Sequence, residues 1–104
     1  MKNSVFLKRE RAVFVIIDMQ EKFQQIIKDF DAISSRICKL IEGCKYLGIP
    51  IIVTEQYPKG LGKTEREIAK TLPEGTKIIE KDAFSACSVS EFNFNLREAH
   101  AEQV

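Results

Sequence analysis

Tryptophan is absent from this chain of 104 residues, histidine occurs once, and cysteine occurs three times. The cysteines, Cys38, Cys44 and Cys87, are odd in number, and none belongs to a Cys-x-x-Cys pair. Both features argue against a disulfide framework and a zinc site, and they favour reduced thiols in a cytoplasmic protein. We therefore expect a single domain over residues 1–104 that is held together by a hydrophobic core.

An excess of charge of one sign is also missing. Lysine and arginine number 16 against 15 acidic residues, and no block of like charges exceeds a few residues. A nucleic-acid or membrane-surface partner is therefore not expected. No apolar run approaches the ~20 residues of a membrane span. The polar start at Met1–Ser4 does not predict a signal peptide.

Three elements are predicted in the first half of the chain: a strand at 12–17, a helix at 26–47 and a strand at 51–54. The first strand is a nearly unbroken apolar run rich in β-branched residues, which is typical of a strand covered on both faces. In the helix, apolar residues recur at steps of three or four, and Asp31 is the expected N-cap of its main part. Gly48 and Pro50 predict where it stops. The result is one βαβ unit, whose crossover requires a parallel partner strand.

The second half is predicted to add a loop, a short helix, a third strand and a third helix. These are a loop marked by Pro58, Gly60 and Gly62, a helix from Thr64 to near Pro73, a strand at 76–80, and a helix on which Val89, Phe92, Leu96 and Ala99 share a face. Thr64 and Glu67 have the spacing of a capping box at the start of the short helix. Ser88 and Glu91 have the same spacing at the start of the last helix. Val104 stands where a fourth strand would begin.

The predicted order is that of an α/β fold, a three-layer Rossmann-like parallel sheet of which this chain contains only the first three strands and helices. In the doubly wound order 3-2-1-4-5-6, the fourth strand pairs beside the first. Without it, the strand at 12–17 becomes an open apolar edge, which is a pairing or aggregation hazard. The domain is therefore expected to be truncated.

Polar residues gather at the carboxyl ends of the predicted strands, where open α/β sheets bind ligands. They are Asp18 and Gln20 after the first strand, Glu55 and Gln56 after the second, and Lys81 and Asp82 after the third. An acid and a lysine at one rim can tune each other's charge state, so Asp18 and Lys81 form a candidate catalytic pair. The alternative is that these strand ends are polar merely because they meet water.

Three motifs stand in order along the chain. They are Val15-Ile16-Ile17-Asp18-Met19-Gln20 with Phe23, the segment 48–58 with Thr54-Glu55-Gln56-Tyr57-Pro58, and Glu80-Lys81-Asp82-Ala83-Phe84-Ser85-Ala86. Together they resemble the opening motif, the second-strand segment and the lysine motif of the isochorismatase-like cysteine hydrolases. The resemblance covers nearly the whole chain, and three motifs in order are far more specific than any one alone.

The resemblance implies hydrolysis of a small amide-like molecule by an Asp, a Lys and a Cys. It makes Asp18 the base that takes the thiol proton, while Lys81 favours the thiolate and helps hold the acid. The thiolate then attacks the carbonyl carbon, and backbone N–H groups stabilise the oxyanion. Phe23, Gln56 and Phe84 are expected to bind the substrate, with core packing as the alternative for both phenylalanines.

The family's cysteine follows the fourth strand, and the resemblance offers no counterpart for it in this chain. Cys44 lies on the apolar stripe of the first helix and Cys38 lies beside it, so both are expected to pack in the core. For Cys87, which follows the loop near Lys81, packing and a reactive role both stay open. The chain alone is therefore expected to be inactive by this mechanism, as a fragment or a shortened product.

No metal and no cofactor are expected. Nicotinamidase relatives build a metal site from an Asp-x-His pair and a further histidine after the second strand. This chain has Thr54-Glu55-Gln56 there and one histidine, His100. The expected partners are a small-molecule substrate and further copies of the chain. The alternative function is a non-catalytic interaction subunit, or shortened pseudoenzyme, that pairs through its open edge strand. A receiver-like binding domain also places acids and a lysine on strand ends, but the three motifs argue against it.

Overall fold

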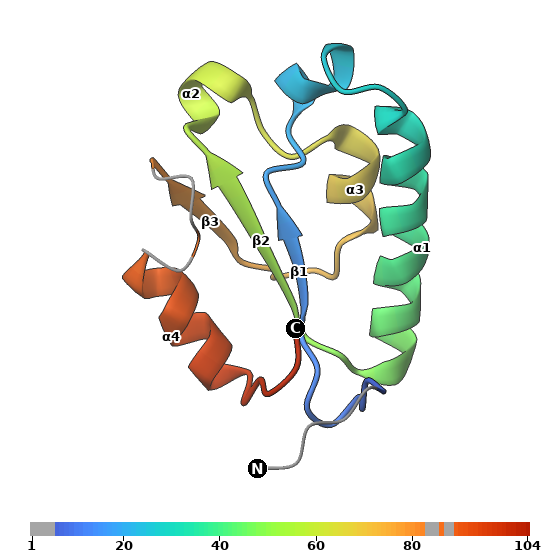
Figure 1. Cartoon of the computed structure of the whole chain (residues 1–104), viewed down its shortest axis with the longest axis vertical. Coiled ribbons are helices and arrows are strands. Elements are labelled where there is room, and N and C mark those ends of the chain that lie inside the picture. The colour runs from blue at the N-terminus through green and yellow to red at the C-terminus, as the bar shows by residue number, and fades with distance from the viewer. Residues whose placement is uncertain (1–5, 83–85, 87–88) are drawn as a thin grey trace.

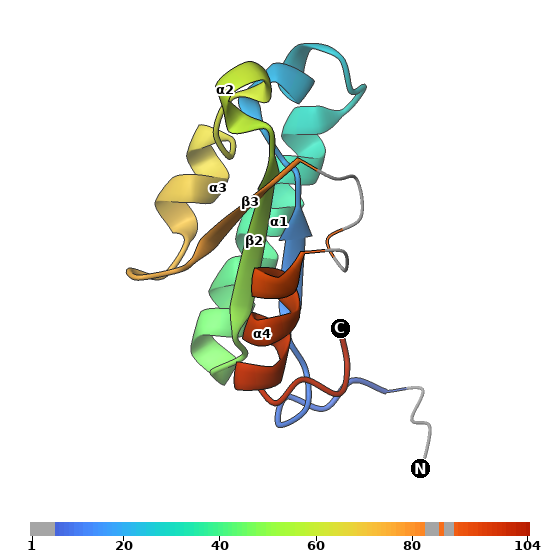
Figure 2. The same ribbon diagram turned by 90° about the vertical axis from the view of Figure 1, so that its left-hand side faces the viewer.

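The computed structural model describes residues 6–82, 86 and 89–104. Its elements are, in chain order, β1 (Phe14–Ile17), the 3-10 helix η1 (Glu21–Gln25), α1 (Phe30–Leu47), β2 (Ile51–Gln56), α2 (Pro58–Leu61), α3 (Arg66–Thr71), β3 (Ile78–Lys81) and α4 (Ser90–Glu98). The strands form a parallel sheet in the order β1-β2-β3. α1 and α3 cover one face of the sheet and α4 covers the other (Figure 1, Figure 2). The predicted α/β class with a three-layer parallel sheet is confirmed.

β1 lies at one edge of the sheet, and its free side carries the beginning of a further parallel pairing. Ala12 and Gln103 form a parallel bridge there. The Val13 N–H donates to the Gln103 carbonyl (2.8 Å), and the Gln103 N–H donates to the Arg11 carbonyl (2.9 Å). The chain therefore returns after α4 to the strand with which it began (Figure 1). This is the position that the doubly wound order assigns to a fourth strand.

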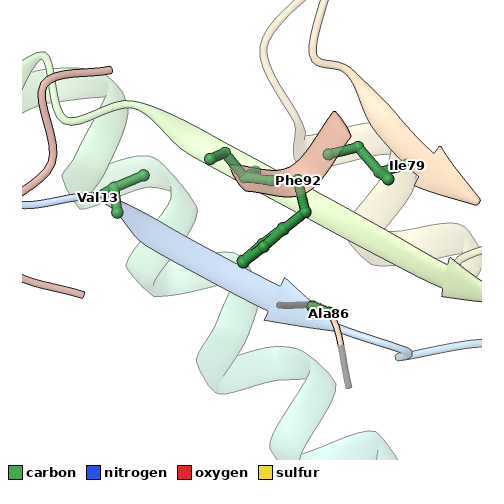
Figure 3. Close-up of a cluster of buried hydrophobic side chains, with 5 residues drawn as sticks. Val13, Ile79, Ala86 and Phe92 are labelled. Atoms are coloured by element: carbon green, nitrogen blue, oxygen red, sulfur yellow. The ribbon is translucent and has the colours of Figure 1, made fainter. Parts of the chain in front are cut away.

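Two clusters of buried apolar side chains hold the layers together, because alternate residues of each strand face opposite sides of the sheet. The cluster under α1 and α3 contains Ile16, Ile41, Val53 and Ile68. The cluster under α4 contains Val13, Ile52, Ile79, Ala86 and Phe92 (Figure 3). Phe92 extends from α4 over the strands and is almost completely buried, which contributes about 2 kcal/mol to stability.

α1 begins later than the apolar spacing predicts. Residues 21–25 form η1, and α1 starts at Phe30 after Asp29, whose φ is 61°. The predicted N-cap Asp31 is wrong, because this residue lies within the first turn and accepts a hydrogen bond from Gln24 Nε2 (2.9 Å). Ile26 is exposed, so its helical spacing to Phe30 did not reflect a shared buried face.

The predicted end of α1 is confirmed. Gly48 has a left-handed backbone (φ 73°), and its N–H donates to the Cys44 carbonyl. Glycine adopts this conformation without the steric cost that a side chain brings, which is why it terminates helices. β2 then begins at Ile51, as predicted.

The capping box predicted at Thr64 and Glu67 is wrong. Glu65 is the N-cap of α3, and its Oε2 accepts the Glu67 N–H (2.5 Å). Thr64 donates instead, through its N–H and its Oγ1, to Oε2 of the buried Glu55 (both 2.7 Å). The carboxylate of Glu55 from β2 thus binds the Thr64 N–H, and Glu65 accepts the Glu67 N–H that the predicted box assigned to the Thr64 hydroxyl.

Three smaller boundaries differ from prediction. The expected loop after β2 contains the single turn of α2, and β3 runs from Ile78 to Lys81 rather than over 76–80. α4 starts at Ser90 with Val89 as its N-cap and no side-chain cap, so its N-cap lies one residue after the predicted Ser88. Ser88 lies outside the described residues. None of the helices in the described part of the chain is long and apolar enough to cross a bilayer.

Candidate active site

Asp18 occupies the turn in which β1 ends. Its backbone is left-handed (φ 55°), yet its N–H still donates to the Thr54 carbonyl of β2 (3.1 Å). A residue other than glycine is uncommon in this region, and such residues gather at functional sites where the surroundings hold them in place. The sheet therefore anchors Asp18 at its carboxyl edge.

Both carboxylate oxygens of Asp18 have partners in the other two strands of the sheet. Lys81 Nζ donates to Oδ2 (2.7 Å), and Thr54 Oγ1 donates to Oδ1 (2.9 Å). The Lys81 side chain is 0% exposed and that of Asp18 is 17% exposed. A charge-assisted hydrogen bond of this length in a buried setting fixes the orientation of both groups. The structure thus brings the predicted pair together, and its catalytic role stays a prediction.

The topology explains why these three side chains meet. The strands are parallel, so their carboxyl ends lie along one rim, with β2 between β1 and β3. Thr54 of β2 is in register with Ile79 of β3, which faces α4. Lys81 follows Ile79 by two residues, so the side chains of Thr54 and Lys81 face the same side. The long lysine side chain spans β2 to reach Asp18. Thr54 was not predicted from the sequence as a site residue, although a threonine at the end of an otherwise apolar strand could have indicated one.

Gln20 is a completely buried polar side chain that joins three segments. Its Nε2 donates to the carbonyls of Gln56 (2.9 Å) and Gly62 (2.7 Å), and its Oε1 accepts the Gln56 N–H (2.7 Å). The segment after β1 is thereby fixed to the end of β2 and to the loop beyond α2. These bonds hold Gln56 through its backbone, so a substrate contact of its side chain stays a prediction.

For the other two predicted substrate residues, Phe23 and Phe84, the structure gives less information. Phe23 is half-buried on η1, and Phe84 lies outside the described residues, so both roles stay predictions. An opening of about 410 Å³ adjoins the end of β3, and it is lined by Pro58, Glu80, Lys81, Asp82, Val89 and Ser90. Among the residues that the structure describes, no group of three or more His, Cys, Asp or Glu is arranged to hold a metal ion.

Neither described cysteine lies near the Asp18–Lys81 pair. Cys44 is buried on α1, and burial raises the pKa of its thiol, which disfavours the reactive thiolate. Cys38 is partly buried and packs against the same cluster under α1 and α3. Both thiols therefore lie on the side of the sheet opposite α4, which agrees with the predicted packing role. Cys87 lies outside the described residues.

The fold and the Asp18–Lys81 pair at the carboxyl edge of the sheet indicate the class of the protein. The chain superposes on solved structures of isochorismatase-type proteins, among them an isochorismatase from Pseudomonas putida at a TM-score of 0.79 and 22% identity, which shows the fold alone. The family model described as Isochorismatase domain matches residues 12–104. The chain therefore belongs to the isochorismatase family, and the resemblance stated from the three motifs is confirmed.

Curated relatives and solved structures agree with this assignment. Isochorismatase domain-containing protein 2 of Danio rerio is 42% identical over 84 residues, covering 81% of this chain and 41% of that protein. Isochorismatase family protein 1A of Dictyostelium discoideum is 36% identical over 104 residues, covering 98% and 50%. A structure described as MAR1 ribonuclease from Caenorhabditis elegans has a TM-score of 0.82 at 38% identity, covering 88% and 47%. The chain thus spans about half the length of the relatives it matches.

Proposed function

We propose that this chain supplies the acid and the lysine of an Asp-Lys-Cys hydrolase that acts on a small amide-like substrate. The observation that carries the proposal is the buried 2.7 Å ion pair of Asp18 and Lys81 at the carboxyl edge of the sheet, in a member of the isochorismatase family. A ligand in an open α/β sheet binds at this edge.

In the proposed reaction, Asp18 accepts the proton of a cysteine thiol. The thiolate sulfur forms a bond to the substrate carbonyl carbon, the carbon–nitrogen bond breaks, and the proton passes from Asp18 to the leaving amine. Water then hydrolyses the thioester and restores the thiol. The partly exposed carboxylate of Asp18 can meet an incoming thiol, whereas the enclosed Lys81 acts as a fixed positive charge that favours the thiolate.

The nucleophile in this proposal lies outside the 104 residues. Cys38 and Cys44 are on the wrong side of the sheet, and Cys44 is further disfavoured by its raised pKa. The chain by itself is therefore proposed to be inactive, while Cys87 is kept as a variant to be tested. The odd number of cysteines also supports a reducing, cytoplasmic location.

The test begins with the intact mass of the natural protein, followed by hydrolysis of a panel of small amides. A mass well above 11.9 kDa would identify the polypeptide that carries the cysteine. In that polypeptide, Asp18→Asn and Lys81→Met should each lower kcat/KM by roughly a thousandfold, as should replacement of the cysteine that follows the fourth strand.

The matched controls are Asp31→Asn and Lys39→Met, which remove the same charges from exposed positions on α1. They should leave hydrolysis unchanged. Hydrolysis that survives Asp18→Asn and Lys81→Met, or that is lost in Cys87→Ala alone, would contradict the proposed triad.

A second candidate is a non-catalytic subunit that assembles through β1. It is supported by the free side of β1, where only the Ala12–Gln103 bridge is formed among the described residues, and by Ile17, which is 54% exposed. An E. coli relative of the same fold, 20% identical, is described as an octameric hydrolase. A natural mass of 11.9 kDa, a defined oligomer in light scattering and no hydrolysis would favour this candidate over the hydrolase.

The substrate panel should also contain a short single-stranded RNA. The C. elegans structure that is 38% identical to this chain is described as a ribonuclease. The near balance of charges supports the expectation that nucleic acid is not the substrate. RNA cleavage that disappears in Asp18→Asn but not in Asp31→Asn would replace the amide with a phosphodiester as the scissile group.

A further inference from the structure

A second concavity, of about 780 Å³, opens on the side of the sheet away from the Asp18–Lys81 pair. Glu55 and Ile78 line it. Val53 is in register with Ile78 and two residues before Glu55, and it belongs to the cluster under α1 and α3. The side-chain alternation therefore puts this cavity and Lys81, whose ammonium binds Asp18, on opposite faces.

The lining of this cavity is rich in positive charge. Four cations, Lys22, Lys63, Arg66 and Lys70, line it together with two carboxylates, Glu21 and Glu55. The local excess is two positive charges, whereas the net charge of the whole chain of 104 residues is +1. Cations from η1, from the loop before α3 and from α3 thus converge on one opening.

Most of these cations are not neutralised by carboxylates. Within the part of the chain that the structure describes, Lys22, Lys63 and Arg66 form no ion pair at 4.0 Å or less, and Lys70 meets Glu67 only at 4.0 Å. Glu55 is buried, and its Oε2 already accepts two hydrogen bonds from Thr64. The side chains that remain available to a ligand are therefore predominantly donors and positive charges.

We propose that this cavity binds the phosphate group of a small phosphorylated molecule. A phosphate offers several oxygens and up to two negative charges, which matches a planar guanidinium beside flexible ammonium groups. The cavity is larger than a phosphate ion, so it leaves room for the organic part of the molecule. Among the described residues, none that lines the cavity belongs to β1 or to its free edge. The proposed binding therefore involves neither the Asp18–Lys81 pair nor a hydrolytic cysteine.

The test is a calorimetric titration of the 104-residue chain with inorganic phosphate, adenosine 5′-monophosphate and adenosine. The monophosphate should bind with a Kd of about 1 mM or tighter, and adenosine should not bind. Tighter binding of the monophosphate than of phosphate would identify a phosphorylated organic molecule as the ligand. Equal binding would identify the free ion as sufficient.

The decisive variant is K63Q/R66Q, which removes two cations from the cavity. It should weaken binding of the monophosphate by roughly tenfold or more, whereas K28Q/K39Q, with the same charge loss at exposed positions outside this lining, should leave binding unchanged. Circular dichroism checks that both variants keep the native fold. Absence of saturable binding at about 10 mM, or equal weakening in both variants, would overturn the proposal. Neither result bears on hydrolysis.

Discussion

The side chain of Lys81 is fully buried, and its ammonium lies 2.7 Å from the carboxylate of Asp18. Removing an ammonium from water costs several kcal/mol, which only a close opposite charge and further hydrogen bonds can offset. Loss of the acid therefore removes the carboxylate partner of a fully buried ammonium, whereas loss of the lysine leaves a carboxylate that is 17% exposed and still accepts a bond from Thr54. The two halves of the pair are not energetically equivalent.

A double-mutant cycle tests this asymmetry. Asp18→Asn should lower the free energy of unfolding by about 3 kcal/mol, and Lys81→Met should lower it by less. The double variant should be more stable than the sum of the two single losses indicates, by about 1–3 kcal/mol. Urea unfolding of the four proteins measures each term. Strict additivity would show that the two charges are not coupled.

Thr54 offers a smaller test of the same site. Thr54→Val keeps the shape of the side chain and removes the donor to Asp18 Oδ1, so it should cost about 1–2 kcal/mol in urea unfolding. Thr54→Ser keeps the hydroxyl and serves as the control for that donor. Equal stability of the valine variant and the native chain would mean that water replaces the hydroxyl without cost.

Among single residues, Asp18 and Lys81 could be named from the sequence because strand-end position and motif are local signals. Thr54 and Gln20 could not be assigned partners in the same way. Their bonds reach 36 residues along the chain, to Asp18 and Gln56, and depend on the pairing of β1 with β2.

At the scale of secondary-structure elements, Gln20 joins the segment after β1, the end of β2 and the loop beyond α2. A fully buried amide with three hydrogen bonds is stabilising only while all its partners remain in place. Any change at this residue therefore acts on the whole rim.

Gln20→Leu should lower the free energy of unfolding by about 2–4 kcal/mol, because it leaves polar groups of Gln56 and Gly62 unpaired. Hydrogen exchange of the Gln56 amide should accelerate more than that of amides in α1. The control Gln24→Leu alters an exposed glutamine on η1 and should change stability by no more than about 0.5 kcal/mol. Unchanged exchange at Gln56 would contradict the proposed role of Gln20 as the link.

The helix starts show where local patterns fail. The apolar periods indicated the helices that became α1 and α4, the spacing of Thr64 and Glu67 indicated the helix that became α3, and Gly48 ended α1 as predicted. The predicted cap at Thr64 was wrong because an acceptor from another element, Glu55, competes for the Thr64 N–H. Spacing along the chain contains no information on that competition.

At the scale of the whole molecule, the sheet is open on the side of β1. The radius of gyration is 13.9 Å, above the roughly 13 Å of a compact chain of this length. Ile17 is 54% exposed on the edge strand, next to the backbone groups that a further strand would pair. An open apolar edge favours pairing with another chain or another segment.

Ile17→Lys should therefore reduce self-association of the 104-residue chain, because a charged edge disfavours strand pairing. Light scattering should show a shift towards 11.9 kDa. The control Ile78→Lys places the same charge on the exposed isoleucine of β3, at the opposite edge of the sheet, and should leave association unchanged. Dissociation in the control alone would assign the contact to β3 instead.

The sequence by itself determined the layers, the parallel strand order beginning at β1 and the two charged members of the candidate site. It could do so because apolar periodicity, helix-stopping glycine and motif order are properties of neighbouring residues. Only the tertiary structure decided that Thr54 and Lys81 share the carboxylate of Asp18, that Gln20 joins the rim, and that four cations converge on the opposite face. Those arrangements depend on the register of three strands and on side chains from segments that are distant in sequence. The free energy of such long-range contacts leaves no pattern among neighbouring residues from which it could be predicted.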